Sequence, residues 1–409
     1  MPQKIEATCV VVGGGPAGLM TGFLLARAGV DTVVIEKHAD FLRDFRGDTI
    51  HPSTLEVMHE LGLLERFLLL PHRKARQIAA WIGDRKIVMA DFTHLPTQCG
   101  FIAFMPQWDF LDFIAGEATK LPNFRLLMST AAEAPLETDG RVAGVRARGP
   151  EGEIEIAARL VVAADGRTSV MRTAAGLEIE QYGAPMDVLW FRLRREPEDP
   201  QETFGRIAPG RMMVMIERGA FWQCGYVIPK GGAAELRGRP IEAFRDEVAA
   251  TVPFVAGRLD EISGWEKVNL LTVQVDRLKR WSRPGLLCIG DAAHAMSPVG
   301  GVGVNLAIQD AVATANLLAG PLRAGTLRDA DLAAVQKRRE FPARVTQRIQ
   351  RIIQDRVIRN VLAADAPIEP PLPLRLFDRF PFLRRLPARL IGLGVRPEHV
   401  AGAVSSSRE

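Results

Sequence analysis

The sequence VVVGGGPAGLMTGFLLARAG, residues 10–29, decides the fold. An apolar run leads directly into a glycine turn, and a segment with apolar residues at helical spacing follows and stops at Gly29. A second apolar run, residues 30–35, ends at Glu36. This order predicts strand, tight turn, helix, strand and acidic residue, which together make the dinucleotide-binding fingerprint.

Each residue of the turn has a physical role in that prediction. Gly13 permits the sharp turn, Gly15 lets the backbone approach a pyrophosphate, and Gly18 lets helix and strand pack closely. Pro16 and Ala17 open the helix, whose free N–H groups favour a phosphate. Glu36 is placed to accept a hydrogen bond from a ribose hydroxyl. A glycine motif alone also occurs in ordinary turns, but the full context favours a bound dinucleotide.

Length and composition indicate a globular protein with two closely packed domains. The chain has 409 residues, of which 47% are hydrophobic and 24% charged. We expect no signal peptide, no membrane-spanning segment, no metal site and a cytoplasmic location, because no charged-then-apolar leader is visible and the four cysteines lie far apart. Nothing resembles a nucleic-acid-binding motif.

The net charge of +4 conceals a basic region near the end of the sequence. Residues 337–396 hold 14 Lys and Arg against 5 Asp and Glu. Such a stretch could face a membrane surface or an anion, although a solvated helical face is the commoner explanation.

Two further motifs follow the glycine turn in order. A buried strand beginning at residue 160 leads into DGRTSVMR, residues 165–172, and another at 286–289 leads into GDAAH, residues 290–294. The glycine-rich PVGGVGVN, residues 298–305, then precedes a helix predicted over 304–322. Three glycines and a proline ahead of a good helix indicate exposed backbone N–H groups at its start.

The remaining pattern predicts an antiparallel sheet inserted between the two halves of the nucleotide domain. Strands are expected at 188–193, 211–216, 222–228 and 268–275, with one helix at 241–251, and a hairpin at 77–92. A separate short strand is expected at 153–156, and a helical region at 329–364 that is interrupted near Pro342.

The ordered triple of motifs resembles the single-component FAD-dependent aromatic monooxygenases, the para-hydroxybenzoate hydroxylase group, over residues 5–322. The resemblance implies an α/β fold: a glutathione-reductase-like, Rossmann-type FAD domain with an inserted antiparallel substrate sheet and C-terminal helices. Expected FAD-binding parts are 1–76, 107–182 and 276–325; substrate-domain strands are 77–106, the substrate sheet is 183–275 and the C-terminal helical region is 326–409.

The resemblance also assigns residues to a tightly but non-covalently bound FAD. Asp165 and Arg172 would support the diphosphate and a transient NAD(P)H, and the helix start at Val304 would face the flavin pyrimidine. The other implied cofactor residues are Lys37, Arg46, Gln107, Gly166, Gly290, Asp291, Pro298, Gly301, Gly303 and Asn305.

By the same resemblance, NAD(P)H reduces FAD, and a flavin C4a-hydroperoxide passes an OH group from O₂ to a phenol-like aromatic ring. The Pro298 carbonyl would lie beside the peroxide. Tyr226, His51 and His294 are candidate proton carriers, although a core or edge tyrosine is the commoner explanation of Tyr226 and structural hydrogen bonds explain the two histidines at least equally well. The family's paired-tyrosine relay has no clear counterpart, since the chain has only two tyrosines. The enzyme would be a monomer or homodimer.

Other functions remain open from the sequence. A flavin-dependent halogenase is disfavoured because its WxWxIP signature is missing; residues before Pro229 read WQCGYVI. An FAD-dependent dehydrogenase or oxidase passing electrons to a quinone or O₂ shares the same motifs. So does a non-catalytic FAD-binding or membrane-docking protein.

Overall fold

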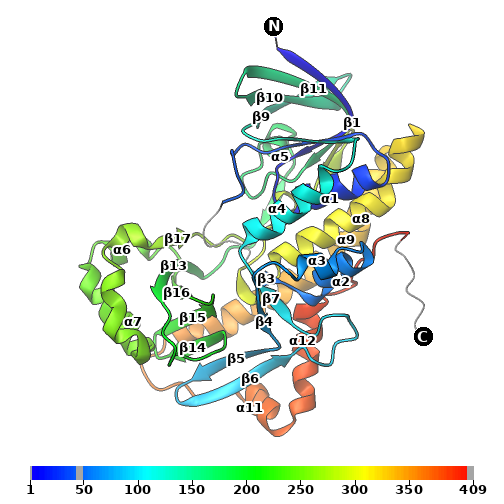
Figure 1. The fold of residues 1–409 in the computed structure, drawn as a ribbon. Helices are drawn as coiled ribbons and strands as arrows, with labels where there is room; N and C mark the ends of the chain where they lie inside the picture. Colours follow the sequence, from blue (N-terminus) through cyan, green and yellow to red (C-terminus); the bar gives the residue numbers. More distant parts are fainter. Residues whose placement is uncertain (1, 43–48, 403–409) are drawn as a thin grey trace.

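A parallel sheet forms the centre of the larger part of the protein (Figure 1). The computed structural model describes residues 2–42 and 49–402. Four pairings, all parallel, join five strands in the spatial order β20 (Leu286–Cys288), β11 (Gly152–Ala163), β1 (Gln3–Val12), β2 (Thr32–Ile35) and β8 (Phe124–Leu127). Edge strand β19 (Ser282–Arg283) runs antiparallel to β20. Consecutive apolar residues are buried in β1 and β2, as in a parallel sheet that is covered on both faces.

Strand β11 also belongs to an antiparallel extension with β10 (Arg141–Gly149) and β9 (Ala131–Thr138). The prediction of separate strands at 153–156 and from 160 was wrong, because one strand of 12 residues covers both. Its first part alternates between buried and exposed residues, whereas its last four residues are all buried. One strand that passes between two environments therefore looks like two strands in the sequence.

Helices cover the parallel sheet. The helix predicted after the glycine turn is α1 (Pro16–Arg27), which packs against α4 (Gln107–Ala118) and α8 (Gly303–Ala324), and α8 packs against α9 (Asp329–Ile353). Residues 299–324 pass a length and composition test for a membrane span, but 78% of the apolar window is buried inside the protein, as in a core helix.

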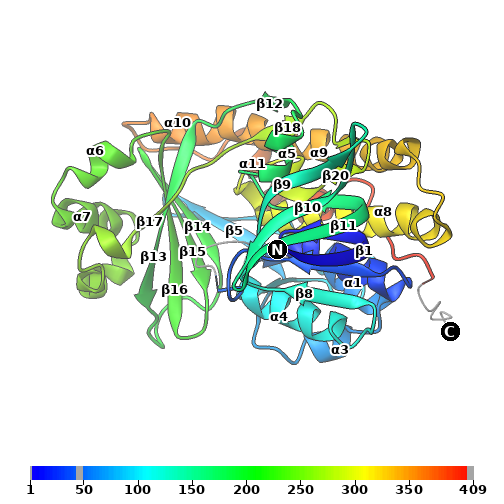
Figure 2. The same ribbon diagram turned by 90° about the horizontal axis from the view of Figure 1, so that it is seen from above.

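A mixed sheet of seven strands makes up the second layer. Its order is β17 (Asn269–Leu271), β13 (Met186–Arg194), β16 (Phe221–Pro229), β15 (Arg211–Glu217), β14 (Phe204–Ala208), β5 (Gln77–Ile82) and β6 (Arg85–Asp91). Figure 2 shows it on the opposite side of the molecule from the parallel sheet, with α6 (Ala233–Arg237) and α7 (Ile241–Thr251) on its outer side. The strand expected at 268–275 is shorter than predicted, since only three residues pair with β13. The domain boundaries given above stay a prediction.

A three-stranded sheet lies at the junction of the two parts: β3 (Thr49–Ile50), β7 (Ile102–Phe104) and β4 (Arg73–Ala75). Smaller elements complete the chain up to the last helices: α2 (Pro52–Glu60), α3 (Leu64–Phe67), α5 (Val170–Ala174), β12 (Ile179–Gln181), η1 (Pro253–Glu261), η2 (Trp265–Lys267), β18 (Asp276–Leu278), η3 (Gly290–Ala292) and η4 (Val299–Gly301).

The C-terminal region is helical. Helix α9 runs through Pro342 without a break, so the predicted interruption was wrong. A proline inside a helix costs about 3 kcal/mol, but Arg339 and Ala343 on either side are buried, and their packing holds the helix together. Beyond it come a π-helical segment, Gln354–Ile358, and then α10 (Arg359–Leu362), α11 (Leu372–Arg379), η6 (Pro381–Arg384) and α12 (Arg385–Gly392).

Candidate active site

The glycine turn between β1 and α1 requires glycine at two positions for packing. Gly13 has φ +105°, and a Cβ there would lie 2.5 Å from the Ala164 carbonyl oxygen. A Cβ on Gly18 would lie 1.8 Å from the Gly13 oxygen. Both positions therefore bring backbone segments closer together than any side chain allows.

Gly15 differs, because a Cβ at this position would meet nothing within 4 Å. The open space beside Gly15 lies in front of α1, and this helix begins at Pro16 with no side-chain cap. The first-turn N–H groups of Ala17 and Gly18 have no acceptor within the helix and suit an anion. An open cradle at an uncapped helix start fits the diphosphate of a dinucleotide.

Glu36 stands at the end of β2, beside this turn. Its carboxylate accepts hydrogen bonds from the Gly14 amide at 2.8 Å and from the His38 amide at 3.1 Å. These bonds orient the carboxylate next to the cradle, where the fingerprint expects a ribose. Lys37 is exposed, and Arg46 lies outside the described residues.

The DGRTSVMR motif holds backbone in place. Asp165 accepts from the Ser169 hydroxyl at 2.5 Å and from the Val170 amide at 2.8 Å, so it supports the cap of α5, whose N-cap residue Ser169 accepts from the Arg172 amide at 3.0 Å. Burial raises the pKa of Asp165 above its usual value, against the opposing effect of these hydrogen bonds. Gly166 follows with φ +82°. Sequence reasoning did not anticipate the capping role.

Arg172 is turned inward and is 4% exposed. Its Nη1 donates to the Ala292 carbonyl at 3.1 Å, so it fixes the turn that follows β20. Contact with a nicotinamide at the surface would need an exposed guanidinium. Arg172 therefore contributes to the site indirectly, by holding the backbone of the turn that follows β20.

The turn after β20 lies directly against the start of α1. Gly290 has φ +57°, and a Cβ there would lie 2.9 Å from the Ala17 Cβ. Asp291 is half-buried and accepts from Arg167 Nε at 3.1 Å. Arg167 was missed from the sequence, although a cation beside Asp165-Gly166 was a usable signal. Two motifs separated by more than 250 residues thus share one site.

The glycine-rich loop before α8 is fixed from both sides. Gly300 and Gly301 have φ +79° and +62°, and the Gly301 amide donates to the Pro298 carbonyl at 3.0 Å. The Gly301 carbonyl accepts from the Thr49 hydroxyl at 2.9 Å. The Pro298 carbonyl, predicted to lie beside a peroxide, is thus also an acceptor within its own turn.

Helix α8 begins at Gly303 with no side-chain cap, which leaves first-turn amides at Gly303 and Val304 available to an acceptor. Asn305 is 3% exposed, and its Oδ1 accepts from Ser53 Oγ at 2.6 Å and Thr54 Oγ1 at 2.8 Å. These bonds attach the start of α8 to α2. Gln107 opens a separate helix, α4, and is partly buried.

A buried charge cluster lies behind the start of α8 and was missed from the sequence. Asp310 accepts from His294 Nε2 at 2.6 Å, from the Gly290 amide at 3.1 Å and from Arg339 Nε at 3.0 Å. Burial alone would raise the pKa of Asp310, but His294 and Arg339 hold it below its usual value. An acidic residue within an apolar helix was the available signal. His294 therefore has a structural partner.

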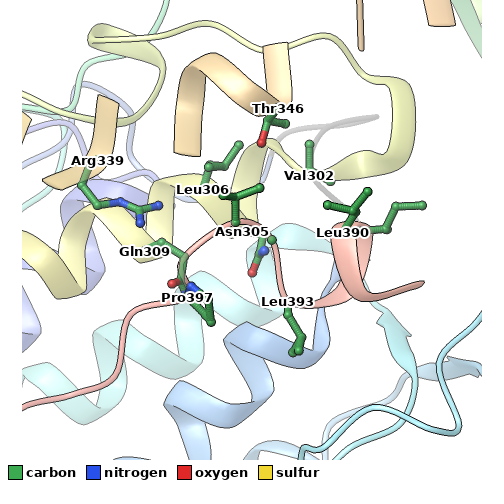
Figure 3. Close-up of a pocket in the computed structure, with 12 residues that line it drawn as sticks. Val302, Asn305, Leu306, Gln309, Arg339, Thr346, Leu390, Leu393 and Pro397 are labelled. Atoms are coloured by element: carbon green, nitrogen blue, oxygen red, sulfur yellow. The ribbon is translucent and has the colours of Figure 1, made fainter. Parts of the chain in front are cut away.

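Figure 3 shows the small pocket beside this cluster, between α8 and residues 390–397. Asn305, Gln309 and Arg339 line it together with the segment around Leu393 and Pro397. Glu398 completes the cluster, with Oε1 at 3.3 Å from Arg339 Nη1. Ionic contacts thus join α8 to α9 and to the segment that contains Glu398.

His51 is fully buried at the start of α2, with Nδ1 2.8 Å from the Ile391 carbonyl oxygen. Burial lowers the pKa of His51 to about 4, against the effect of the Ile391 and Gly301 carbonyls. The ring is therefore neutral near pH 7 and donates from Nδ1 to Ile391. The ring lies near the Gly301 carbonyl of the glycine-rich loop and has no access to solvent.

Tyr226 is not brought to the other candidates. Its ring packs in the core between the seven-stranded sheet and α7, and its hydroxyl donates to Glu247 at 2.9 Å. Burial and Glu247 raise its pKa above the usual range. Residues on the opposite face of the sheet, including Val188 and Val227, share a cluster with Val299 of the glycine-rich loop. Strand alternation therefore directs Tyr226 away from the site.

All four cysteines are free and buried. Within residues 2–42 and 49–402, no group of three or more His, Cys, Asp or Glu side chains could hold a metal ion.

Comparison with known proteins shows the family of this chain. Residues 6–349 match the FAD binding domain family. The chain is 30% identical to 6-methylpretetramide 4-monooxygenase of Streptomyces rimosus, covering 93% of this chain and 91% of that enzyme. It is 27% identical to the 12-dehydrotetracycline 5-monooxygenase/anhydrotetracycline 6-monooxygenase of Streptomyces rimosus subsp. rimosus, covering 97% and 76% respectively.

Solved structures share the fold. PqsL, a probable FAD-dependent monooxygenase from Pseudomonas aeruginosa, has a TM-score of 0.74 at 21% identity, covering 88% of this chain and 98% of PqsL. OxyS anhydrotetracycline hydroxylase from Streptomyces rimosus has a TM-score of 0.73 at 24% identity, covering 96% and 77%. The predicted fold class is confirmed. The chain belongs to the FAD binding domain family, as a single-component FAD-dependent aromatic monooxygenase.

Proposed function

We propose that this monooxygenase hydroxylates a polycyclic, phenol-like aromatic compound, with NAD(P)H as reductant and O₂ as oxidant. The observation that carries the substrate class is the inner face of the seven-stranded sheet. Apolar side chains of β13 and β16, among them Val188 and Val227, cluster there with Val299, and Trp190 and Met212 pack against them. An apolar wall next to the glycine-rich loop suits fused rings.

The names of the relatives support a large substrate. Two are named for 6-methylpretetramide and for 12-dehydrotetracycline and anhydrotetracycline. No arginine stands out in the sequence as a clamp for a substrate carboxylate. An extended neutral or phenolic ring system therefore agrees better with these residues than a small carboxylated ring.

The residues that would hold FAD form two groups in this proposal. The turn from Gly13 to Gly18 binds the diphosphate, and Glu36 binds the adenosine ribose. Asp291, oriented by Arg167, accepts from a ribityl hydroxyl. When bound, FAD supplies the electron transfer and the activation of oxygen.

The protein's own contribution is electrostatic and steric. The uncapped start of α8 favours negative charge in front of Val304, because its N–H groups and the helix dipole point there. Asn305, held by Ser53 and Thr54, fixes this helix start in place. The apolar sheet face excludes water from the reacting atoms. NAD(P)H is bound only transiently, and the enzyme acts in the cytoplasm as a monomer or homodimer.

The test begins with purified protein and its flavin. Anaerobic mixing with NADH or NADPH should bleach the bound flavin, faster in the presence of tetracyclic phenols. Aerobic turnover should yield a product heavier by one oxygen atom, measured by mass spectrometry with ¹⁸O₂. Stoichiometric H₂O₂ with every phenol tried would instead indicate an oxidase, and a flavin that NAD(P)H never bleaches would indicate a non-catalytic protein.

A further inference from the structure

The helices α11 and α12 carry most of a concentrated exposed apolar surface. Thirteen large hydrophobic side chains are exposed in the described chain, and six of them lie between residues 372 and 390. They are Leu372, Leu376, Phe380, Phe382, Leu386 and Leu390. Exposed apolar residues scattered singly are normal, whereas a concentration of them marks an interaction surface.

Arginines alternate with these residues in a regular pattern. An arginine directly precedes an apolar residue at positions 375–376, 379–380, 385–386 and 389–390, and all eight residues are exposed. The first two of these Arg–apolar pairs are four residues apart, and so are the last two. Side chains four residues apart share one side of a helix. In α12, Arg385 and Arg389 therefore lie alongside Leu386 and Leu390.

The opposite faces of both helices attach them to the protein. Both contact β6, and Figure 1 shows α11 below this strand and α12 beside it. Leu374 packs against the cluster that contains Ile87, and Ala388 is fully buried in the cluster that contains Phe92. The exposed leucines, phenylalanines and arginines therefore lie on the sides of these helices that face away from the protein.

Only some of the arginines in this segment are paired with a carboxylate. Arg384 pairs with Asp378, and Arg375 pairs with Glu369. Arg379, Arg385 and Arg389 have no acidic partner among residues 2–42 and 49–402. The surface therefore combines apolar side chains with arginines whose charge no neighbouring carboxylate neutralises.

We propose that residues 372–390, which we call the Arg–Leu surface, dock this enzyme on an anionic lipid bilayer. An interfacial helix buries its apolar side chains at the acyl boundary while its basic side chains meet lipid phosphates. Arginine stems also cover apolar surface and leave the guanidinium at the headgroups. A second copy of the chain would place arginines against arginines, which repel each other. The proposal does not depend on the identity of the aromatic substrate.

The experiment measures co-sedimentation of the FAD-loaded full chain with vesicles. One set contains phosphatidylcholine alone, and the other contains phosphatidylcholine and phosphatidylglycerol in equal parts. Binding is expected only to the second set and should weaken with added salt. Each arginine near an anionic surface is worth about fivefold in partitioning, so R379Q/R385Q/R389Q should bind about 100-fold more weakly.

Matched variants separate this surface from general charge and hydrophobicity. R280Q/R348Q/R356Q removes the same charge elsewhere, and L69S removes the most exposed leucine elsewhere; both should bind about as well as the wild type. L376S/L386S should lose binding. The flavin absorbance spectrum and circular dichroism of every variant should be unchanged, which shows that each folds.

Three results would overturn the proposal. The first is absence of wild-type binding to the anionic vesicles. The second is equal loss in the two arginine triples. The third is a wild-type dimer in sedimentation velocity that L376S/L386S dissociates while vesicle binding is absent, because the surface would then belong to a second copy.

Discussion

The Arg339 guanidinium meets the Asp310 carboxylate in the core, with Nε 3.0 Å from Oδ1 and both side chains 1% exposed. Arg339 also approaches Glu398, which is 3% exposed. Replacing Arg339 with Met would remove the guanidinium that bridges the two buried carboxylates, leaving Asp310 with His294 alone and Glu398 with Arg338 alone. We expect a loss of about 3–5 kcal/mol in the free energy of unfolding, measured by urea denaturation.

Arg338 provides the matched control, because it pairs with the same Glu398 from a side chain that is 56% exposed. Arg338→Met should cost less than about 1 kcal/mol, since exposed pairs are weak. Similar losses in the two variants would contradict the importance of burial. Arg339→Met should in addition weaken FAD binding, because Asp310 also holds the Gly290 amide.

Two glycines of the first turn should respond differently to alanine. Gly18→Ala places a Cβ 1.8 Å from the Gly13 oxygen, so the variant should be largely insoluble or unfolded by circular dichroism. Gly15→Ala meets nothing within 4 Å and should fold normally, but its methyl group occupies the proposed diphosphate cradle. Its FAD dissociation constant, from flavin fluorescence, should rise at least about tenfold. A Gly15→Ala protein that binds FAD as wild type would refute the cradle.

His51 makes stability depend on pH. Its pKa is about 4 in the folded protein and about 6.5 when unfolded, so the unfolded state binds more protons between these values. Stability should therefore fall as pH drops through this window, and His51 should account for about 2 kcal/mol of the loss between pH 7 and pH 5.

The measurement is urea denaturation of wild type and His51→Gln at both pH values with saturating FAD. The wild type should lose more stability on acidification than the variant. The same pH dependence in both proteins would show that His51 does not carry it.

Tyr226→Phe should leave turnover close to wild type, because the hydroxyl bonds to Glu247 on the α7 side of the sheet. Loss of the Tyr226 hydroxyl should lower the free energy of unfolding by about 1 kcal/mol. Glu247 keeps its ion pair with Arg239, at 2.8 Å. Steady-state kinetics with the hydroxylated substrate decide the question: a loss of kcat beyond about 100-fold would return Tyr226 to the reaction.

The sequence predicted the local backbone of the site well, because glycine requirements are local. Gly13 and Gly18 permit contacts within one strand–turn–helix unit, and their spacing alone identifies that unit. The start of α8 was similarly visible from the run of glycines before it. The helix interruption at Pro342 failed as a prediction because packing of Arg339 and Ala343 overrides the local cost of proline.

Side-chain partners across the chain were the part that sequence reasoning missed. Asp310, Arg339 and Glu398 come together from three separate segments, and no periodicity in the sequence reveals such a contact. Tyr226 looked like a candidate because one strand exposes two faces, and sequence does not tell which face meets the glycine-rich loop. The capping role of Asp165 depends likewise on a hydrogen bond seen only in the folded turn.

Strand β11 ends beside the strand that follows the whole inserted region, with Ala163 paired to Cys288. The long excursion that builds most of the seven-stranded sheet therefore leaves and re-enters the nucleotide fold through adjacent backbone. Segments whose ends lie together are tolerated as exchangeable modules. Evolution, or an engineer building chimeras, can thus replace the proposed substrate sheet, provided that Arg167 and Arg172, which also lie in this excursion, are kept to hold the turn after β20.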